Sequence, residues 1–244
     1  MHTNEEHPGG TRLLLGPAKE LVLQQSIAAS DMYKLLSMFF RFPTEEMAIG
    51  ILDGSLSDDV LAIFEELGIW DNRTELIKTK LGTLQVGLSE KDAYITQMRR
   101  EYTRLFSHPS EPVINLYETL FLFEPEEKGQ DKPVLFISPA ALDAERCYRK
   151  AGFVRSNTVN EPSDHLSIEF EFMAYLYLNK ARALHENNGD QPAQLNIQIR
   201  EFSEIHLRKW ALNFFDRCVS SSTSPIYETF GRIGNIFLHQ ILSN

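Results

Sequence analysis

One stretch most constrains the fold, the loop and helix that run from Glu161 to Met173. Pro162 cannot continue a preceding helix and favours extended backbone in the residue before it. Ser163 and Asp164 are both common N-cap residues, so we expect a helix to start there. Asp164 and His165 are then expected to stand at the mouth of this helix, within reach of solvent and of the unpaired N–H groups of its first turn.

The predicted helix is apolar over much of its circumference. One face carries Leu166, Phe170, Met173, Tyr177, Ala181 and Leu184 at helical spacing, and a second row of Ile168, Phe172 and Leu176 lies beside it. A helix with so wide an apolar surface is buried in the middle of a domain. We therefore expect a domain built around this helix.

The rest of the chain also has helical periodicity, and the period-two alternation of sheet is missing. The fold class predicted is all-α, a single domain of about ten helices around the central one. Residues 1–18 are predicted to be a flexible tail and residues 19–244 the helical domain. A candidate hinge at 124–137, rich in charge with Pro125 and Gly129, would divide the domain into two helical halves.

Three further local patterns lead to specific predictions. Val134 to Ile137 resembles a strand but is too isolated to build a sheet. Ser138 and Pro139 predict a helix start, and Gly152 its end. Apolar spacing from Leu195 to Phe214, with His206 and Trp210 on the same face, predicts one long helix.

Composition limits the partners that the chain can have. Its formal net charge is -10, which disfavours nucleic acid and anionic membranes and suits a cationic partner, although plain solubility explains the charge equally well. No apolar run approaches the ~20 residues that span a bilayer, so we expect no stable membrane insertion and a cytoplasmic location. Cys147 and Cys218 are far apart and predict reduced thiols without a disulfide or zinc site.

Catalytic and metal motifs do not emerge from the sequence. The phosphate-loop, nucleophile-elbow and dinucleotide patterns are missing. A di-iron site needs Glu-x-x-His pairs, and the residues three before His165, His185 and His206 are not Glu. We therefore expect no enzyme, cofactor or metal.

Two polar positions allow more than one interpretation. His165 and Glu169 share a helix face and, with Glu161, could form half of a metal site, but a hydrogen-bonded pair at a helix start is the preferred interpretation. His206 is interpreted as a satisfied core histidine and Trp210 as a core residue. Asp164 either caps the helix or also meets a cationic peptide.

Three segments together resemble one family. The first is Glu-Pro-x-Asp-His-Leu-x-x-Glu-Phe-x-Phe-Met from Glu161, the second is Glu-Tyr-x-Arg-Leu-Phe from Glu101, and the third is His-Leu-x-x-Trp-x-x-x-Phe from His206. They occur in the same order in the TorD/DmsD/NarJ family of molybdoenzyme maturation chaperones, and the chain is most similar to the TorD/DmsD branch. Tyr117-Glu118-Thr119 resembles a further Tyr-Glu-Ser element of the family, with Thr in place of Ser.

The resemblance implies a helical cytoplasmic chaperone. It would bind the twin-arginine leader of a molybdopterin-dependent oxidoreductase subunit, or that subunit's apoprotein, assist cofactor insertion and delay export until folding is complete. The family can exchange helical halves between chains, so both a monomer and a domain-swapped dimer remain open. An alternative is a helical scaffold or nucleotide-responsive adaptor that docks the mature client without a leader.

The resemblance also assigns candidate leader-binding residues. The Asp-His pair of the motif is where the family is understood to bind the leader. We expect Glu161, Asp164 and Glu118 to receive the arginines and His165 to orient Asp164 or contact the leader backbone. The remaining candidates are Pro162 in the motif loop and Tyr117 and Trp70 as groove residues.

Overall fold

The computed structural model describes residues 16–243, except 87–90, 109–110, 124–132 and 156–159. The first helix begins at Pro17, so the last two residues of the predicted tail are helical. Residues 1–15 of that tail and residues 124–132, which make up most of the candidate hinge, lie outside the described residues.

The described residues form α-helices almost throughout. In chain order they are α1 (Pro17–Phe39), α2 (Glu45–Leu52), α3 (Ser55–Glu66), α4 (Asn72–Val86), α5 (Lys91–Phe106), α6 (Glu118–Phe121), the 3₁₀ turn η1 (Leu135–Ile137), α7 (Pro139–Ala151), α8 (Leu166–His185), α9 (Gln191–Phe202), the π-helical turn η2 (Ser203–Leu207), α10 (Arg208–Ser221) and α11 (Pro225–Leu242). The β structure within this described part is a single bridge between Tyr117 and His165. The all-α prediction is confirmed.

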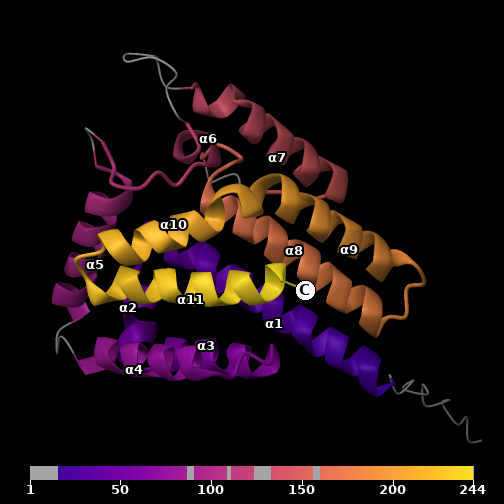
Figure 1. Ribbon diagram of the computed structural model, residues 1–244, viewed down its shortest axis with the longest axis horizontal. Helices are drawn as coiled ribbons and strands as arrows, with labels where there is room; N and C mark the ends of the chain where they lie inside the picture. The colour runs from indigo at the N-terminus through magenta and orange to yellow at the C-terminus, as the bar shows by residue number, and fades with distance from the viewer. Residues whose placement is uncertain (1–15, 87–90, 109–110, 124–132, 156–159, 244) are drawn as a thin grey trace, which may run out of the picture.

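Helix α8 is the predicted central helix, and this prediction is also confirmed. Its apolar side chains are almost all buried, and it packs most extensively on α1. Two serines of α1 fasten the pair, since Ser30 Oγ donates to the Ala174 carbonyl (2.9 Å) and Ser37 Oγ donates to the Ser167 carbonyl (2.8 Å). In Figure 1 the two edges of the molecule carry α3 with α4 and α6 with α7, and the long helices lie between them.

The predicted helix from Leu195 to Phe214 is interrupted. A π-helical turn at Ser203–Leu207 separates α9 from α10. A π turn inserts one extra residue into a helix and changes the direction of the side chains that follow. Here the turn contains His206, whose side chain is buried beside Phe202, with the ring centroids 4.5 Å apart.

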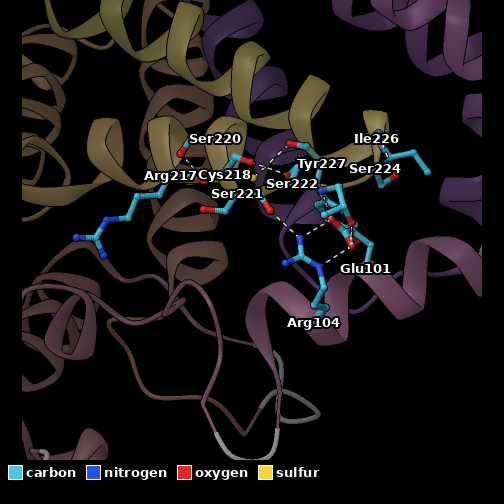
Figure 2. A network of polar contacts seen from close by, with 11 residues as sticks. Glu101, Arg104, Arg217, Cys218, Ser220, Ser221, Ser222, Ser224, Ile226 and Tyr227 are labelled. Carbon is cyan, nitrogen blue, oxygen red and sulfur yellow. Dashed lines mark hydrogen bonds and ion pairs between the residues drawn. The ribbon is translucent and has the colours of Figure 1, made fainter.

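The second motif segment ties α5 to the loop between α10 and α11, as Figure 2 shows. Glu101 accepts two hydrogen bonds from Thr223, at 2.7 Å from its N–H and 2.9 Å from its hydroxyl. Arg104 pairs with both oxygens of Glu101, at 2.8 and 2.9 Å, and also donates to the Ser221 carbonyl. Burial alone would raise the pKa of Glu101, but the bonds from Arg104 and Thr223 lower it to about 2. This motif therefore has a structural role.

The segment from Val134 to Gly152 forms a short turn followed by helix α7. Val134–Ile137 is not a strand; Leu135–Ile137 form the 3₁₀ turn η1, because these residues have no neighbouring strand to pair with. The Ser138 and Gly152 predictions are confirmed, since Ser138 Oγ accepts from the Ala141 N–H (3.2 Å) and Gly152 ends α7 with a φ of 74°.

Among the described helices, none combines the length and apolarity needed to cross a bilayer.

Candidate functional site at the entrance to helix α8

The motif loop before α8 is held against the segment that starts α6. The backbone N–H of Leu166 donates to the Leu116 carbonyl (2.8 Å), and the N–H of Glu118 donates to the Asp164 carbonyl (3.0 Å). Asp164 Oδ2 accepts from the N–H of Thr119 (3.0 Å). Asp164 therefore caps α6, a helix 45 residues earlier in the chain, and the expectation that it caps its own helix is wrong. Only folding could bring these two segments together.

His165 is the N-cap of α8. Its Nδ1 accepts from the N–H of Ser167 (3.2 Å), and the Ser167 hydroxyl lies 2.9 Å from the same atom. Burial, with a contribution from Arg41, lowers the pKa of His165 to about 3, so the ring is neutral at pH 7. Asp164 is 0% exposed and His165 4%, so the expectation that solvent reaches both is wrong. Asp164 Oδ2 is bonded to Thr119 and Asp164 Oδ1 makes no hydrogen bond, so His165 does not orient Asp164 by a hydrogen bond in the described structure.

Helix α7 fixes the other side of the loop. The Tyr148 hydroxyl donates to the Ser163 carbonyl (2.7 Å), and Ser163 Oγ donates to Glu145 Oε2 (2.6 Å). Arg155, just beyond α7, donates to the Glu161 carbonyl (2.7 Å). The loop is thus held at both ends by hydrogen bonds and is a rigid platform rather than a free arm.

Glu161 and Tyr117 are the accessible members of the predicted set in this loop region. Both are half-buried, and the Tyr117 hydroxyl donates to Glu161 Oε2 (2.7 Å). Burial raises the pKa of Tyr117, and the bond to Glu161 adds to the shift. Pro162, next in the chain, is buried. Glu161 therefore offers a partly accessible carboxylate at this surface.

Glu118 faces the interior instead. Its Oε2 lies 2.6 Å from His206 Nδ1, and the side chains are 3% and 1% exposed. Burial would lower the pKa of His206, but contacts with Cys147 and Glu118 and the charge of Glu169 raise it to about 10. The two residues therefore form a buried ion pair, so His206 is a core histidine whose Nδ1 is paired, while its Nε2 makes no hydrogen bond. Trp210, one helical turn later, is 0% exposed, as expected of a core residue.

Glu169 departs from the sequence interpretation. Neither of its carboxyl oxygens makes a hydrogen bond, so the predicted pair with His165 is wrong. The residue is fully buried, and burial together with nearby Glu118 raises its pKa well above the usual range. Glu118, Glu169 and His206 place ligand-type atoms within 4.8 Å of one another. Sequence reasoning missed this cluster, because its members come from three separate helical segments.

Trp70 lies apart from the other candidates. It occupies the connection between α3 and α4 and is 63% exposed. Figure 1 shows that connection on the side of the molecule opposite α6 and α7. The structure therefore brings Tyr117, Glu118, Glu161, Asp164 and His165 together and leaves Trp70 elsewhere.

Exposed apolar side chains occur on the segments around this site. We call this set the apolar surface of α7: Leu122, Val134, Phe136, Ile137, Leu142 and Val154, each between 42% and 85% exposed. A hydrogen bond between the hydroxyls of Thr119 and Ser138 (2.7 Å) holds α6 against the start of α7, so these segments are neighbours. Exposed apolar side chains on neighbouring segments are a feature of interaction sites.

More than half of the chain matches the model of a known protein family. Residues 71–216, which include the motif loop and the cluster around His206, match the family model described as nitrate reductase delta subunit.

Individual relatives carry related descriptions. A chaperone protein TorD of Vibrio cholerae is 31% identical over 85 residues, which are 34% of this chain and 36% of the relative. The alignment thus spans about a third of that protein. A perchlorate reductase assembly chaperone protein of Dechloromonas aromatica is 27% identical over 193 residues, 77% of this chain and 76% of the relative. A TorD of Shewanella pealeana is 22% identical over 84% of this chain and 83% of the relative.

Proposed function

Because this chain belongs to the nitrate reductase delta subunit family, we propose that it is a maturation chaperone for a molybdopterin-dependent oxidoreductase subunit. Its relatives are named chaperones and assembly proteins. In this proposal the chain binds the twin-arginine leader of the client, its apoprotein or both, in the cytoplasm. It assists cofactor insertion and delays export until the client has folded. The chain's own task is binding, and no catalytic step is assigned to it.

The observation that carries the proposal is the position of Glu161. It presents a partly accessible carboxylate on a loop that is fixed from both sides. An arginine of the leader can donate two parallel hydrogen bonds to a carboxylate, and a charge-assisted bond contributes roughly 1.5–3 kcal/mol. Tyr117 holds Glu161 in place, which lowers the entropy lost on binding.

The apolar part of a leader has a matching surface. The apolar surface of α7 lies on the segments next to the motif loop. Burial of apolar area contributes about 25 cal/mol per Å², so a short apolar segment laid over these side chains would add to the arginine contacts. The net charge of -10 also favours a cationic peptide.

The other motif residues act in this proposal through the loop. Asp164 and His165 keep the loop in shape by capping α6 and α8, and Pro162 within the loop is buried. Glu118 is engaged with His206 and acts as a buried support. Trp70 lies on the other side of the molecule and would contact a client beyond its leader.

Calorimetric titration of the full chain with synthetic twin-arginine leaders of molybdoenzymes tests the proposal. Copies of each leader with both arginines replaced by alanine are run beside them, and Glu161→Gln protein is run in parallel. We expect binding that is weakened both by removal of the arginines and by Glu161→Gln. Glu171→Gln is the matched control. Glu171 lies in the second turn of α8 and is also half-exposed, but its carboxylate is already paired with Arg41.

A different result would redirect the proposal. If no leader binds to the folded protein, the leader-binding part is wrong. Binding of the apoprotein that survives loss of its leader would instead support the alternative of a scaffold for the mature client.

A further inference from the structure

A second cluster of ligand-type side chains lies on the inner side of α7. Asp143 and Cys147 are four residues apart, so they lie on one face of this helix. His206 approaches them from the π-helical turn. One ligand atom from each of the three lies within 4.8 Å of the other two. His206 Nε2 and Asp143 Oδ2 are 3.3 Å apart, a separation that two ligands of one metal ion also have when each is at about 2.0–2.2 Å from it.

The imidazole of His206 is arranged as in a metal site. Its Nδ1 is held by Glu118 Oε2 at 2.6 Å, which fixes the ring and leaves Nε2 as the atom turned toward Asp143 and Cys147. Nε2 makes no hydrogen bond, although the residue is only 1% exposed. Metal-bound histidines usually donate their other ring N–H to a carboxylate in this way. This buried nitrogen has an ion-pair neighbour, Asp143, but no hydrogen bond, and a metal ion bound between the two would give it a direct partner.

From this geometry we propose that Asp143, Cys147 and His206 bind a zinc ion. Thiolate, imidazole and carboxylate are the donors that zinc takes in proteins, and three protein ligands leave a fourth position open. Asp143 and Cys147 are partly exposed, so an ion can enter from solvent and the fourth ligand can be water or a client group. On binding, the ion replaces the proton of the Cys147 thiol and any proton on Nε2, and these protons pass to solvent.

The bound ion would join two parts of the structure. Asp143 and Cys147 belong to α7, the helix that also holds Leu142 of the apolar surface of α7. His206 belongs to the turn between α9 and α10. A ligand that binds only the folded state stabilises it by mass action, so zinc is expected to raise the melting temperature. This site does not depend on leader binding, so its test is separate from that of the proposed function.

The experiment is a titration of metal-free full-length protein with Co²⁺, followed by absorption spectroscopy. We expect one equivalent to bind, with a thiolate-to-cobalt charge-transfer band in the near ultraviolet and displacement of cobalt by Zn²⁺. Cys147→Ser is expected to remove the band. Glu118→Gln is expected to weaken binding about 10–100-fold, the usual effect of losing the carboxylate behind a metal-bound histidine.

Cys218→Ser is the matched control, because Cys218 is buried in α10 away from the cluster and should leave the band unchanged. Circular dichroism and melting curves show whether each variant is folded, and zinc is expected to raise the melting temperature of wild type but not of Cys147→Ser. Absence of the charge-transfer band in folded wild type would overturn the proposal. Cobalt binding without that band would also overturn it, because Cys147 would then not be a ligand.

Discussion

Asp164 and Glu161 are three residues apart in the motif loop and have opposite environments. Asp164 is fully buried, and its carboxylate accepts a hydrogen bond from the N–H of Thr119. Glu161 is partly exposed and has one carboxylate oxygen held by Tyr117. Burial thus separates a structural residue, Asp164, from Glu161, the residue that we propose for recognition, and residue type alone does not reveal this difference.

Asp164→Ala is expected to lower the free energy of unfolding by about 1–3 kcal/mol, because it leaves the Thr119 N–H without its acceptor in a buried place. Glu161→Gln is expected to change it by no more than about 0.5 kcal/mol, since that side chain is at the surface. Urea unfolding of both variants measures the difference. Equal stability of the two variants would contradict the structural role of Asp164.

Helix α5 is held in place by hydrogen bonds to a loop that is distant in the sequence. The Glu101–Arg104 pair bonds to Thr223 and Ser221, so residues more than a hundred positions apart hold α5 against the α10–α11 loop (Figure 2). The Glu101 motif is thus explained by the packing of one element on another. Gly234 of α11 is likewise required for packing, because a Cβ there would overlap the Phe215 ring of α10.

Acid is expected to weaken this tie between elements. The pKa of Glu101 is lowered from 4.5 to about 2 in the folded chain, so its contribution is complete above about pH 4.5 and is lost as pH falls toward about 2. Glu101→Gln should cost about 1.5–3 kcal/mol near neutral pH, the value of hydrogen bonds to a charged group. Denaturant unfolding across this pH range measures both. The variant should show a flatter pH dependence, and an unchanged slope would refute the assignment.

Two glycine substitutions form a matched pair. Gly234→Ala is expected to destabilise the protein by about 1–3 kcal/mol, because the added methyl forces α10 and α11 apart. Gly82→Ala, inside α4 with no atom within 4 Å of the new Cβ, is expected to stabilise it by about 0.4–1 kcal/mol. Melting temperatures of the two variants compare them directly. Destabilisation by both would show that helix propensity is not what decides the result at position 82.

Charge matters at the scale of the whole molecule. With 34 acidic and 24 basic residues, the chain has a net negative charge that favours cationic partners, while Glu161 is proposed to supply a specific contact. The general field raises the rate of encounter, and the local pair sets the position of the ligand. The two contributions respond differently to salt and to mutation.

Leader affinity is expected to fall several-fold when ionic strength rises from about 0.05 M to about 0.5 M, because added salt screens charges separated by more than a Debye length. Glu161→Gln should lower affinity at every salt concentration and leave most of the salt dependence in place. Titrations of both proteins over this range make the comparison. A salt-independent affinity would mean that the apolar surface of α7 alone binds the leader.

Much of the fold followed from the sequence. The apolar rows from Leu166 to Leu184 identified α8 as the buried centre, because helical spacing of apolar residues is a local pattern. Ser138 and Gly152 bounded α7 for the same reason, since caps depend on a few neighbouring residues. The motif segments from Glu101, Glu161 and His206 indicated the family that the comparison shows.

The sequence did not reveal which polar residues are buried or how they pair. That Asp164 caps α6, that Glu118 meets His206, and that Cys147 and Asp143 lie beside the same ring depend on contacts between segments 40 to 90 residues apart. Periodicity describes a single helix, whereas these contacts depend on how helices are stacked and on one π-helical turn. Local chemistry therefore determined the elements, and tertiary packing alone decided which carboxylates reach solvent and which remain inside.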